Sequence, residues 1–209
     1  MNSSRVSSSV ALVACAASFL TLAACGSHTD TSSTSSTSKP SVAEVVASSV
    51  TPTAAAPSGC PSAASESGGT PDWTLSGATG SIAVTGSTDT TEPRVQVNAP
   101  FSVTETQVHT LHAGDGPVVA NTATVSVCYM GVNGRDGSVF DSSYERGAPV
   151  EFALNGVVPG FQKAIAGQKV GSTVAVAMAS ADGYPDGEPR AGIAPGDSLV
   201  FAIKILGAA

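Results

Sequence analysis

Apolar and polar residues alternate along five stretches in the second half of the chain. This period of two predicts β-strands that each bury one face. The alternation is strongest in the last stretch, where every second residue is a large apolar one: Leu199, Phe201, Ile203 and Ile205. The expected strands span residues 106–111, 124–130, 150–154, 173–179 and 198–206.

One segment between the third and fourth expected strands has helical spacing instead. In VVPGFQKAIAGQKVG, residues 157–171, the side chains of Phe161, Ala164 and Ile165 fall on one face of a helix of about two turns. Pro159 suits the first turn of this helix and Gly167 suits its end. Several antiparallel strands with a single short helix predict an α+β domain, in which the helix lies across the concave face of the sheet and shares its core.

The first third of the chain has a different composition. Residues 25–70 are rich in Ser, Thr, Ala and Pro and poor in large apolar side chains, so burial cannot offset the entropy lost on ordering them. We expect a disordered tether over this segment. Residues 71–102 contain short alternating pieces and are expected to form an N-terminal extension, anchored by Trp73, that packs onto a main domain over residues 103–209.

The N-terminus, MNSSRVSSSVALVACAASFLTLAACGS, has one basic residue, Arg5, before an apolar run. The run is shorter than the roughly 20 residues of a membrane-spanning helix, so residues 1–24 are expected to be a secretory signal peptide. Residues 22–25 resemble the lipobox of bacterial lipoproteins, which implies cleavage before Cys25 and its lipidation. Lipidation would hold the protein on the extracytoplasmic side of the cell membrane. An ordinary cleaved signal peptide is the alternative.

The net charge narrows the range of partners. The formal charge is −7 and becomes more negative when Arg5 leaves with the signal peptide. An acidic surface argues against binding to nucleic acid or, through a polybasic patch, to anionic lipids.

The cysteines leave one candidate pair. Cys15 would leave with the signal peptide and Cys25 would be lipidated, so Cys60 and Cys128 remain in an oxidising compartment. A disulfide between them and two free thiols are both compatible with the sequence, because the sequence supplies no distance.

No metal or cofactor is expected. Of the three histidines, His28 lies in the expected tether, and His109 and His112 have no nearby cysteines and no convincing set of further ligands. The chain also has neither a Gly-rich phosphate loop with its lysine nor a Gly-x-Ser-x-Gly nucleophile elbow.

Five motifs follow one another with the order and spacing of FKBP-type peptidyl-prolyl cis-trans isomerases, which the chain resembles over about residues 103–208. They are VSVCYMG, VFDSSYERGAPVEF, GVVPGFQKAIAGQKVG, GYPDGEP and DSLVFAIKIL. The resemblance implies a half-barrel of five to six antiparallel strands wrapped around the short helix. It also implies an apolar cup, lined by aromatic side chains, that accepts a prolyl ring.

The resemblance assigns roles to individual residues. Tyr129, Asp141, Phe161 and Tyr184 would form the catalytic set. Phe161 would be the floor of the cup, where most members have tryptophan, and the Tyr184 hydroxyl would donate to a substrate carbonyl. Arg146 and the Tyr129 hydroxyl would be the partners of the Asp141 carboxylate. The other residues expected to bind substrate are Phe140, Val157, Val158 through its backbone N–H, Ile193 and Phe201.

Three positions depart from the family pattern. Val150 stands where an aromatic residue is common, Gly192 where a branched residue is common, and Cys128 where histidine is usual. Because side chains alternate along a strand, Cys128 is expected on the face opposite Tyr129 and the cup. The tether or the extension could reach it there.

The reaction that the resemblance implies requires no nucleophile. Rotation about an X-Pro bond has a barrier of about 18–20 kcal/mol because amide resonance is lost. A dry apolar cup that binds the twisted amide more tightly than the planar forms would lower this barrier. The expected ligands are proline-containing segments of exported proteins and macrolides such as tacrolimus. The alternatives are a non-catalytic proline-binding chaperone or adaptor lipoprotein, and a structural lipoprotein with a vestigial pocket.

Overall fold

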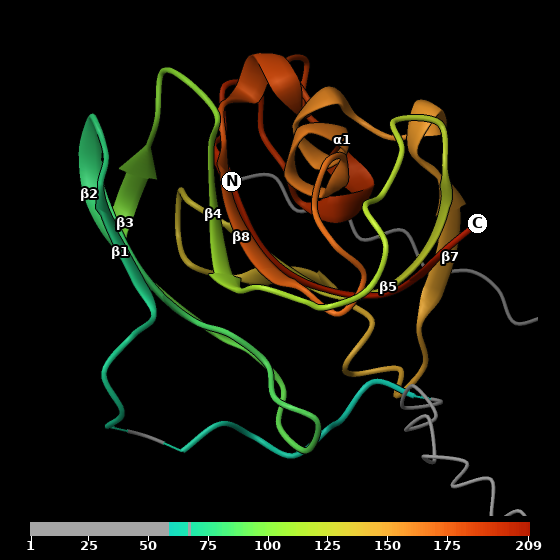
Figure 1. Ribbon diagram of the computed structural model, residues 1–209. Coiled ribbons are helices and arrows are strands. Elements are labelled where there is room, and N and C mark those ends of the chain that lie inside the picture. Colours follow the sequence, from blue (N-terminus) through green and yellow to red (C-terminus); the bar gives the residue numbers. More distant parts are fainter. Residues whose placement is uncertain (1–58, 67) are drawn as a thin grey trace, which may run out of the picture. The chain divides into compact units, whose positions relative to one another are not determined.

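Six antiparallel strands form the main sheet, which curves around one helix without closing into a barrel (Figure 1). Four strands run side by side in the order β4, β8, β9, β5, and the two halves of β5 pair with β7 and β6. This is the expected α+β half-barrel. The strands are β4 (Gln107–His112), β5 (Thr124–Asn133), β6 (Val139–Ser142), β7 (Val150–Ala153), β8 (Thr173–Met178) and β9 (Leu199–Ala208).

The computed structural model describes residues 59–66 and 68–209. The expected signal peptide, the lipidation site Cys25 and the tether as far as residue 58 lie outside these residues. Within the part that the structure describes, no helix is both long and apolar enough to cross a membrane.

The helix α1 (Pro159–Ile165) lies against the concave face of the main sheet (Figure 1). It buries Phe161, Ala164 and Ile165, as its sequence pattern predicts. Gly160 allows a close approach to β8, because a Cβ at this position would lie 2.5 Å from Cγ of Met178. The other helical segments are single 3-10 turns, η1 (Leu154–Gly156), η2 (Ser180–Asp182) and η3 (Pro189–Ala191).

The N-terminal extension forms a second antiparallel sheet of three strands, β1 (Trp73–Ser76), β2 (Thr79–Thr85) and β3 (Arg94–Ser102). It packs on the face of β8 and β9 that points away from α1. Alternation along β8 explains this double burial, because Val174, Val176 and Met178 face the main core whereas Ala175 and Ala177 face the extension. The residues of the extension buried in this second core are Ile82, Val84 and Phe101, and Val103 directly after it is buried there too.

Trp73 lies at the margin of this second core and is half-buried. Its ring stacks on the imidazole of His109 in β4, with ring centroids 5.4 Å apart and planes 9° apart. The expected anchoring role of Trp73 therefore involves both the second core and an edge strand of the main sheet.

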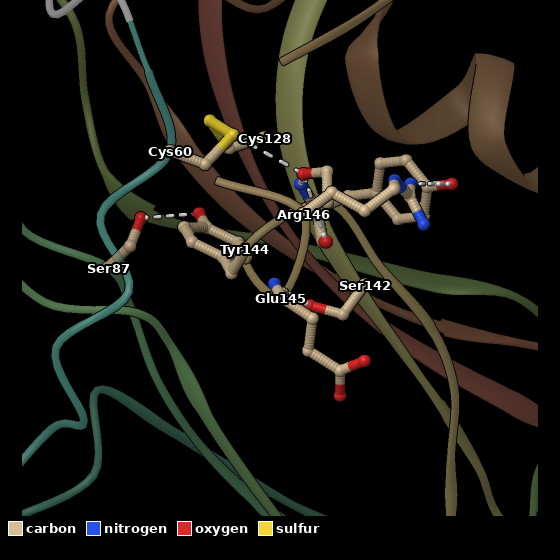
Figure 2. Close-up of a disulfide and its surroundings, with 9 residues drawn as sticks. Cys60, Ser87, Cys128, Ser142, Tyr144, Glu145 and Arg146 are labelled. Carbon is tan, nitrogen blue, oxygen red and sulfur yellow. Dashed lines mark hydrogen bonds between the residues drawn. A yellow bond between two sulfur atoms is a disulfide. The ribbon is translucent and has the colours of Figure 1, made fainter. Parts of the chain in front are cut away.

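Cys60 and Cys128 form a disulfide, with their Cα atoms 5.7 Å apart (Figure 2). Cys60 lies within the segment expected to be a tether, yet it is buried. The backbone N–H of Glu92 also donates to the carbonyl of Ala63 over 2.8 Å. Residues 59–66 thus pack on the domain, although their composition shows too few apolar side chains to predict it.

The second core should contribute strongly to stability. Replacing Phe101, which is 2% exposed, by alanine is expected to lower the free energy of unfolding by about 3–5 kcal/mol, measured by urea denaturation. Val108→Ala is the control, because Val108 on β4 is 38% exposed and should change the same free energy by about 0.5 kcal/mol or less. Equal effects of the two substitutions would contradict the assigned packing.

Candidate active site

A cavity of about 290 Å³ opens between α1, the main sheet and the loops at its rim. Its volume is at the lower end of typical ligand sites, about 300–1,000 Å³, which suits a small ring or a side chain. The polar side-chain groups of the lining are the Asp141 carboxylate and the hydroxyls of Tyr129 and Tyr184. The full lining is Tyr129, Phe140, Asp141, Val150, Phe152, Gly156, Val157, Val158, Phe161, Tyr184 and Phe201.

Aromatic rings in edge-to-face contact form the floor and walls. Phe161 from α1 is nearly perpendicular to Phe201 of β9, with centroids 5.2 Å apart. Phe140 of β6 contacts Phe201 in the same way over 5.5 Å, and Phe152 of β7 contacts Phe161 over 5.3 Å. This geometry is the favoured one for aromatic pairs and fixes each ring through its neighbours.

Gly131 in β5 makes room for two of these rings. A Cβ at this position would lie 2.7 Å from Cζ of Phe140 and 2.9 Å from Cε1 of Phe201. Both distances are well below the usual contact distance of about 3.5–4.0 Å between carbon atoms. The glycine of the VSVCYMG motif is therefore a steric requirement of the cavity wall.

At the rim of the cavity, Asp141 accepts hydrogen bonds from two side chains. The Tyr129 hydroxyl donates to Oδ2, and Nη1 of Arg146 lies 2.5 Å from Oδ1. Nη2 of Arg146 also donates to the Tyr129 hydroxyl over 3.3 Å. Asp141 and Arg146 of the FDSSYER stretch thus form an ion pair, and both are hydrogen-bonded to Tyr129 of β5.

The ionisation states follow from these contacts. Burial alone would raise the pKa of Asp141, but the hydrogen bonds from Tyr129 and Arg146 outweigh it and lower the pKa below its ordinary value. Burial and the bond to Asp141 raise the pKa of Tyr129 to about 12. At neutral pH the carboxylate is charged and the phenol keeps its proton, so a fixed negative charge lies at the rim.

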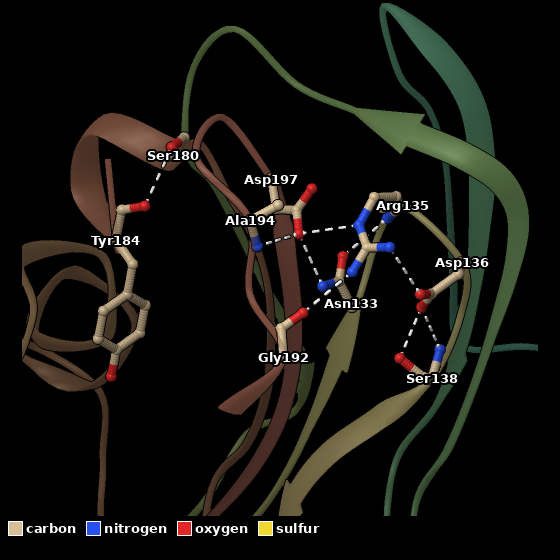
Figure 3. A network of polar contacts seen from close by, with 9 residues as sticks. All are labelled: Asn133, Arg135, Asp136, Ser138, Ser180, Tyr184, Gly192, Ala194 and Asp197. Atoms are coloured by element: carbon tan, nitrogen blue, oxygen red, sulfur yellow. Dashed lines mark hydrogen bonds and ion pairs between the residues drawn. The ribbon is translucent and has the colours of Figure 1, made fainter. Parts of the chain in front are cut away.

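Tyr184 lies in the loop between β8 and β9, and its position is set through its backbone (Figure 3). Its carbonyl accepts from the N–H of Gly187 over 2.9 Å and from the hydroxyl of Ser180 over 3.4 Å. Nζ of Lys163 in α1 lies 2.7 Å from Oδ2 of Asp182, which joins the start of the loop to the helix. Among the described residues, no hydrogen bond occupies the Tyr184 hydroxyl, so it can donate to a ligand.

A buried carboxylate holds the second half of this loop (Figure 3). Oδ2 of Asp197, whose side chain is 7% exposed, accepts from Asn133 Nδ2 over 2.8 Å, from the N–H of Ala194 over 2.8 Å and from Nε of Arg135 over 3.2 Å. Burial would raise the pKa of Asp197, but these hydrogen bonds lower it. Arg135 further donates to the carbonyl of Gly192 over 3.0 Å. The hairpin after β5 thereby fixes the loop that carries Tyr184.

Most of the residues expected in the cup do line the cavity. They are Tyr129, Phe140, Asp141, Val157, Val158, Phe161, Tyr184 and Phe201. Arg146 lies outside the lining and contacts it only through Asp141 and Tyr129. The carbonyl of Val158 accepts from Phe161 and Gln162 at the start of α1, and the expected role of its N–H toward substrate stays a prediction.

Ile193, also expected in the cup, does not line the cavity: its side chain is 2% exposed and belongs to the main core. Its expected role in substrate binding stays a prediction. Sequence reasoning missed Phe152. Its signal was available, because Val150 and Phe152 alternate in the same strand and so share a face. Both line the cavity.

Residues 59–66 and 68–209 contain no group of three or more His, Cys, Asp or Glu side chains placed to hold a metal ion. The histidines among them, His109 and His112, instead contact the extension, through the Trp73 ring and Asp72 respectively.

The family model described as FKBP-type peptidyl-prolyl cis-trans isomerase matches residues 116–206. The FKBP-type 22 kDa peptidyl-prolyl cis-trans isomerase of Escherichia coli K12 is 38% identical over 100 residues, 48% of this chain and 48% of that protein. The FK506-binding protein of Streptomyces anulatus is 38% identical over 44% of this chain and 77% of that protein. A probable FK506-binding protein of Corynebacterium glutamicum is 30% identical over 56% of this chain and 98% of that protein. The chain spans about half the length of the E. coli relative.

Gly131→Ala tests the wall of the cavity. The added methyl group must displace Phe140 and Phe201, so the free energy of unfolding is expected to fall by about 1–3 kcal/mol in urea denaturation. The ring resonances of both phenylalanines should also shift in NMR spectra. Gly69→Ala is the matched control, because a Cβ there meets nothing within 4 Å. Wild-type stability and unshifted rings in Gly131→Ala would show that the wall is not tightly packed.

Proposed function

Because the chain belongs to the family of FKBP-type peptidyl-prolyl cis-trans isomerases, we propose that it catalyses cis/trans rotation about X-Pro bonds. The observation that carries the proposal is the cavity floored by Phe161 and Phe201 and lined by Tyr184, whose hydroxyl has no hydrogen-bond partner among the described residues. A prolyl ring is the small apolar ring that such a cavity fits.

The cavity accelerates the rotation by binding its intermediate geometry. Uncatalysed isomerisation takes about 10–100 s at 25 °C. The planar amide owes its resonance to charge separation between oxygen and nitrogen, which water solvates well, whereas the twisted amide has lost that resonance. Aromatic walls that replace water therefore favour the twisted form over either planar form. A difference of about 4 kcal/mol in binding gives roughly a 10³-fold acceleration.

The polar groups orient the substrate. Tyr184 donates its hydroxyl to a carbonyl of the substrate chain, while the prolyl ring lies on Phe161. Asp141 and Tyr129 keep single ionisation states at neutral pH, so they act through charge and hydrogen bonding and transfer no proton. Rotation breaks no covalent bond, so these interactions are sufficient for the reaction.

The clients are proline-containing segments of exported proteins, and the protein acts on the extracytoplasmic side of the membrane, anchored through lipid on Cys25. The disulfide between Cys60 and Cys128 supports this location, because such bonds persist in oxidising compartments. Macrolides such as tacrolimus are proposed as small-molecule ligands, since relatives are named FK506-binding proteins.

Tyr184→Phe tests catalysis with the ring retained. Loss of one hydrogen bond to the substrate is expected to lower kcat/KM for a proline-containing reporter peptide about fivefold, in a protease-coupled assay. Val108→Ala, on a distant edge strand, should leave kcat/KM unchanged. A wild-type protein that binds the peptide without accelerating its isomerisation would be a proline-binding chaperone or adaptor and would overturn the proposal.

Cys25→Ser tests the lipid anchor. The wild-type protein is expected in the membrane fraction and should incorporate a labelled fatty acid, whereas the variant should be soluble and unlabelled. Membrane association of the variant equal to that of the wild type would contradict anchoring through Cys25.

A further inference from the structure

The loop that carries Arg146, residues 143–147, is held by residues 59–66 and by the N-terminal extension, residues 71–102. The backbone N–H of Cys60 donates to the carbonyl of Gly147 over 3.3 Å. The Tyr144 hydroxyl donates to Oγ of Ser87 over 2.9 Å (Figure 2). Cys60, in residues 59–66, and Ser87, in the extension, therefore hold opposite ends of this loop.

The disulfide brings Cys60 next to a cavity residue, because Cys128 directly precedes Tyr129 in β5. Ser143 contacts both Cys60 and Tyr129. The Ser143 hydroxyl accepts from the N–H of Tyr129 over 2.8 Å. It also lies 3.4 Å from both the Cys60 sulfur and the Tyr129 carbonyl, to either of which it can donate. A displaced Cys60 would thus remove one of the partners that hold Ser143.

Burial under the extension also fixes the loop. Tyr144 is 1% exposed and packs in a third core that contains Cys60, Cys128, Met130 and Val132. Desolvation in this core raises the pKa of Tyr144 to about 12. Displacement of Cys60 would remove one of the apolar side chains that share this core with Tyr144.

Arg146, two residues after Tyr144, depends on a loop backbone that is held in place. The Arg146 side chain is 48% exposed, and an exposed ion pair contributes little on its own because ordering a long side chain costs entropy. Only a fixed backbone at residues 143–147 presents the guanidinium to Asp141 and Tyr129 at the observed distances. The pair at the cavity rim therefore depends on contacts on the opposite side of β5.

We propose that Cys60 and Ser87 are positioning residues of the isomerase site, which hold Arg146 against Asp141 and Tyr129 through the loop 143–147. This inference rests on the proposed function. Residues 59–66 and the N-terminal extension, which both lie outside the span matched by the family model, would then contribute to the geometry of the site.

The double variant Cys60→Ala/Cys128→Ala tests the proposal. It should lower kcat/KM about threefold or more, and the same substitutions should have no further effect in an Arg146→Ala background, because they act through that residue. Ser87→Ala keeps the disulfide and should change kcat/KM in the same direction by a smaller factor. It also serves as the test variant if the double variant does not fold.

A second readout is the pKa of the Asp141 carboxyl, followed by carbon NMR. In the wild type this pKa lies below its ordinary value, so the charged form and the stability it contributes persist until the pH falls through that low value. Loosened contacts to Arg146 and Tyr129 leave burial unopposed, so the pKa should rise in both variants. The acid limb of the pH–activity profile should move to higher pH by the same amount.

Ile82→Ala is the control, because Ile82 belongs to the extension but packs in the second core and has no bond to the loop. It should lower the free energy of unfolding and leave both kcat/KM and the Asp141 pKa unchanged. An active wild type whose kcat/KM and Asp141 pKa are unaffected in the double variant and in Ser87→Ala would overturn the inference. An inactive wild type would overturn the proposed function instead, while the NMR titration would still decide whether the extension positions Arg146.

Discussion

The alternation of side chains along β5 is the constraint on which the rest of the structure depends. Val125, Val127 and Tyr129 face α1 and the cavity, whereas Cys128 and Met130 face the extension. A shift of one residue in the pairing of β5 with β9 would exchange the two sets and bring Cys128 into the cavity. The aromatic cavity and the disulfide are therefore fixed together, on the two faces of one strand.

Small residues at defined positions allow the layers to approach one another. Gly131 leaves room for Phe140 and Phe201, and Gly160 lets α1 pack against Met178. On the other face of the main sheet, Ala175 and Ala177 give the extension a flat surface to cover. Large side chains at these positions would separate the layers, so the cavity depends on these small residues as much as on the aromatic ones.

The sequence was sufficient where the signal was local. Alternation predicted five of the six strands of the main sheet, the spacing of Phe161, Ala164 and Ile165 predicted the helix, and the order of motifs predicted most of the cavity lining. It also placed Cys128 on the face opposite Tyr129.

Contacts between segments that are far apart in the chain could not be predicted from the sequence. Asp197 and Asn133 are 64 positions apart, and no pattern in either segment indicates that they meet. Residues 59–66 are held by a disulfide and by backbone hydrogen bonds to distant segments, which their composition does not reveal. Ile193 was expected in the cup but is buried in the main core, which depends on packing that the motif around it does not encode.

These features make an aromatic-lined site whose shape is set by packing and whose rim charge, on Asp141, is maintained by Arg146 and Tyr129. We propose that this site lowers the barrier to amide rotation because it binds the twisted amide more tightly than the planar forms. The most direct measurement is exchange NMR of a short proline-containing peptide with a substoichiometric amount of the protein. We predict that cross-peaks between the cis and trans resonances appear at mixing times below about 1 s, since unassisted exchange takes about 10–100 s. Exchange at the unassisted rate, with the peptide demonstrably bound, would contradict the account.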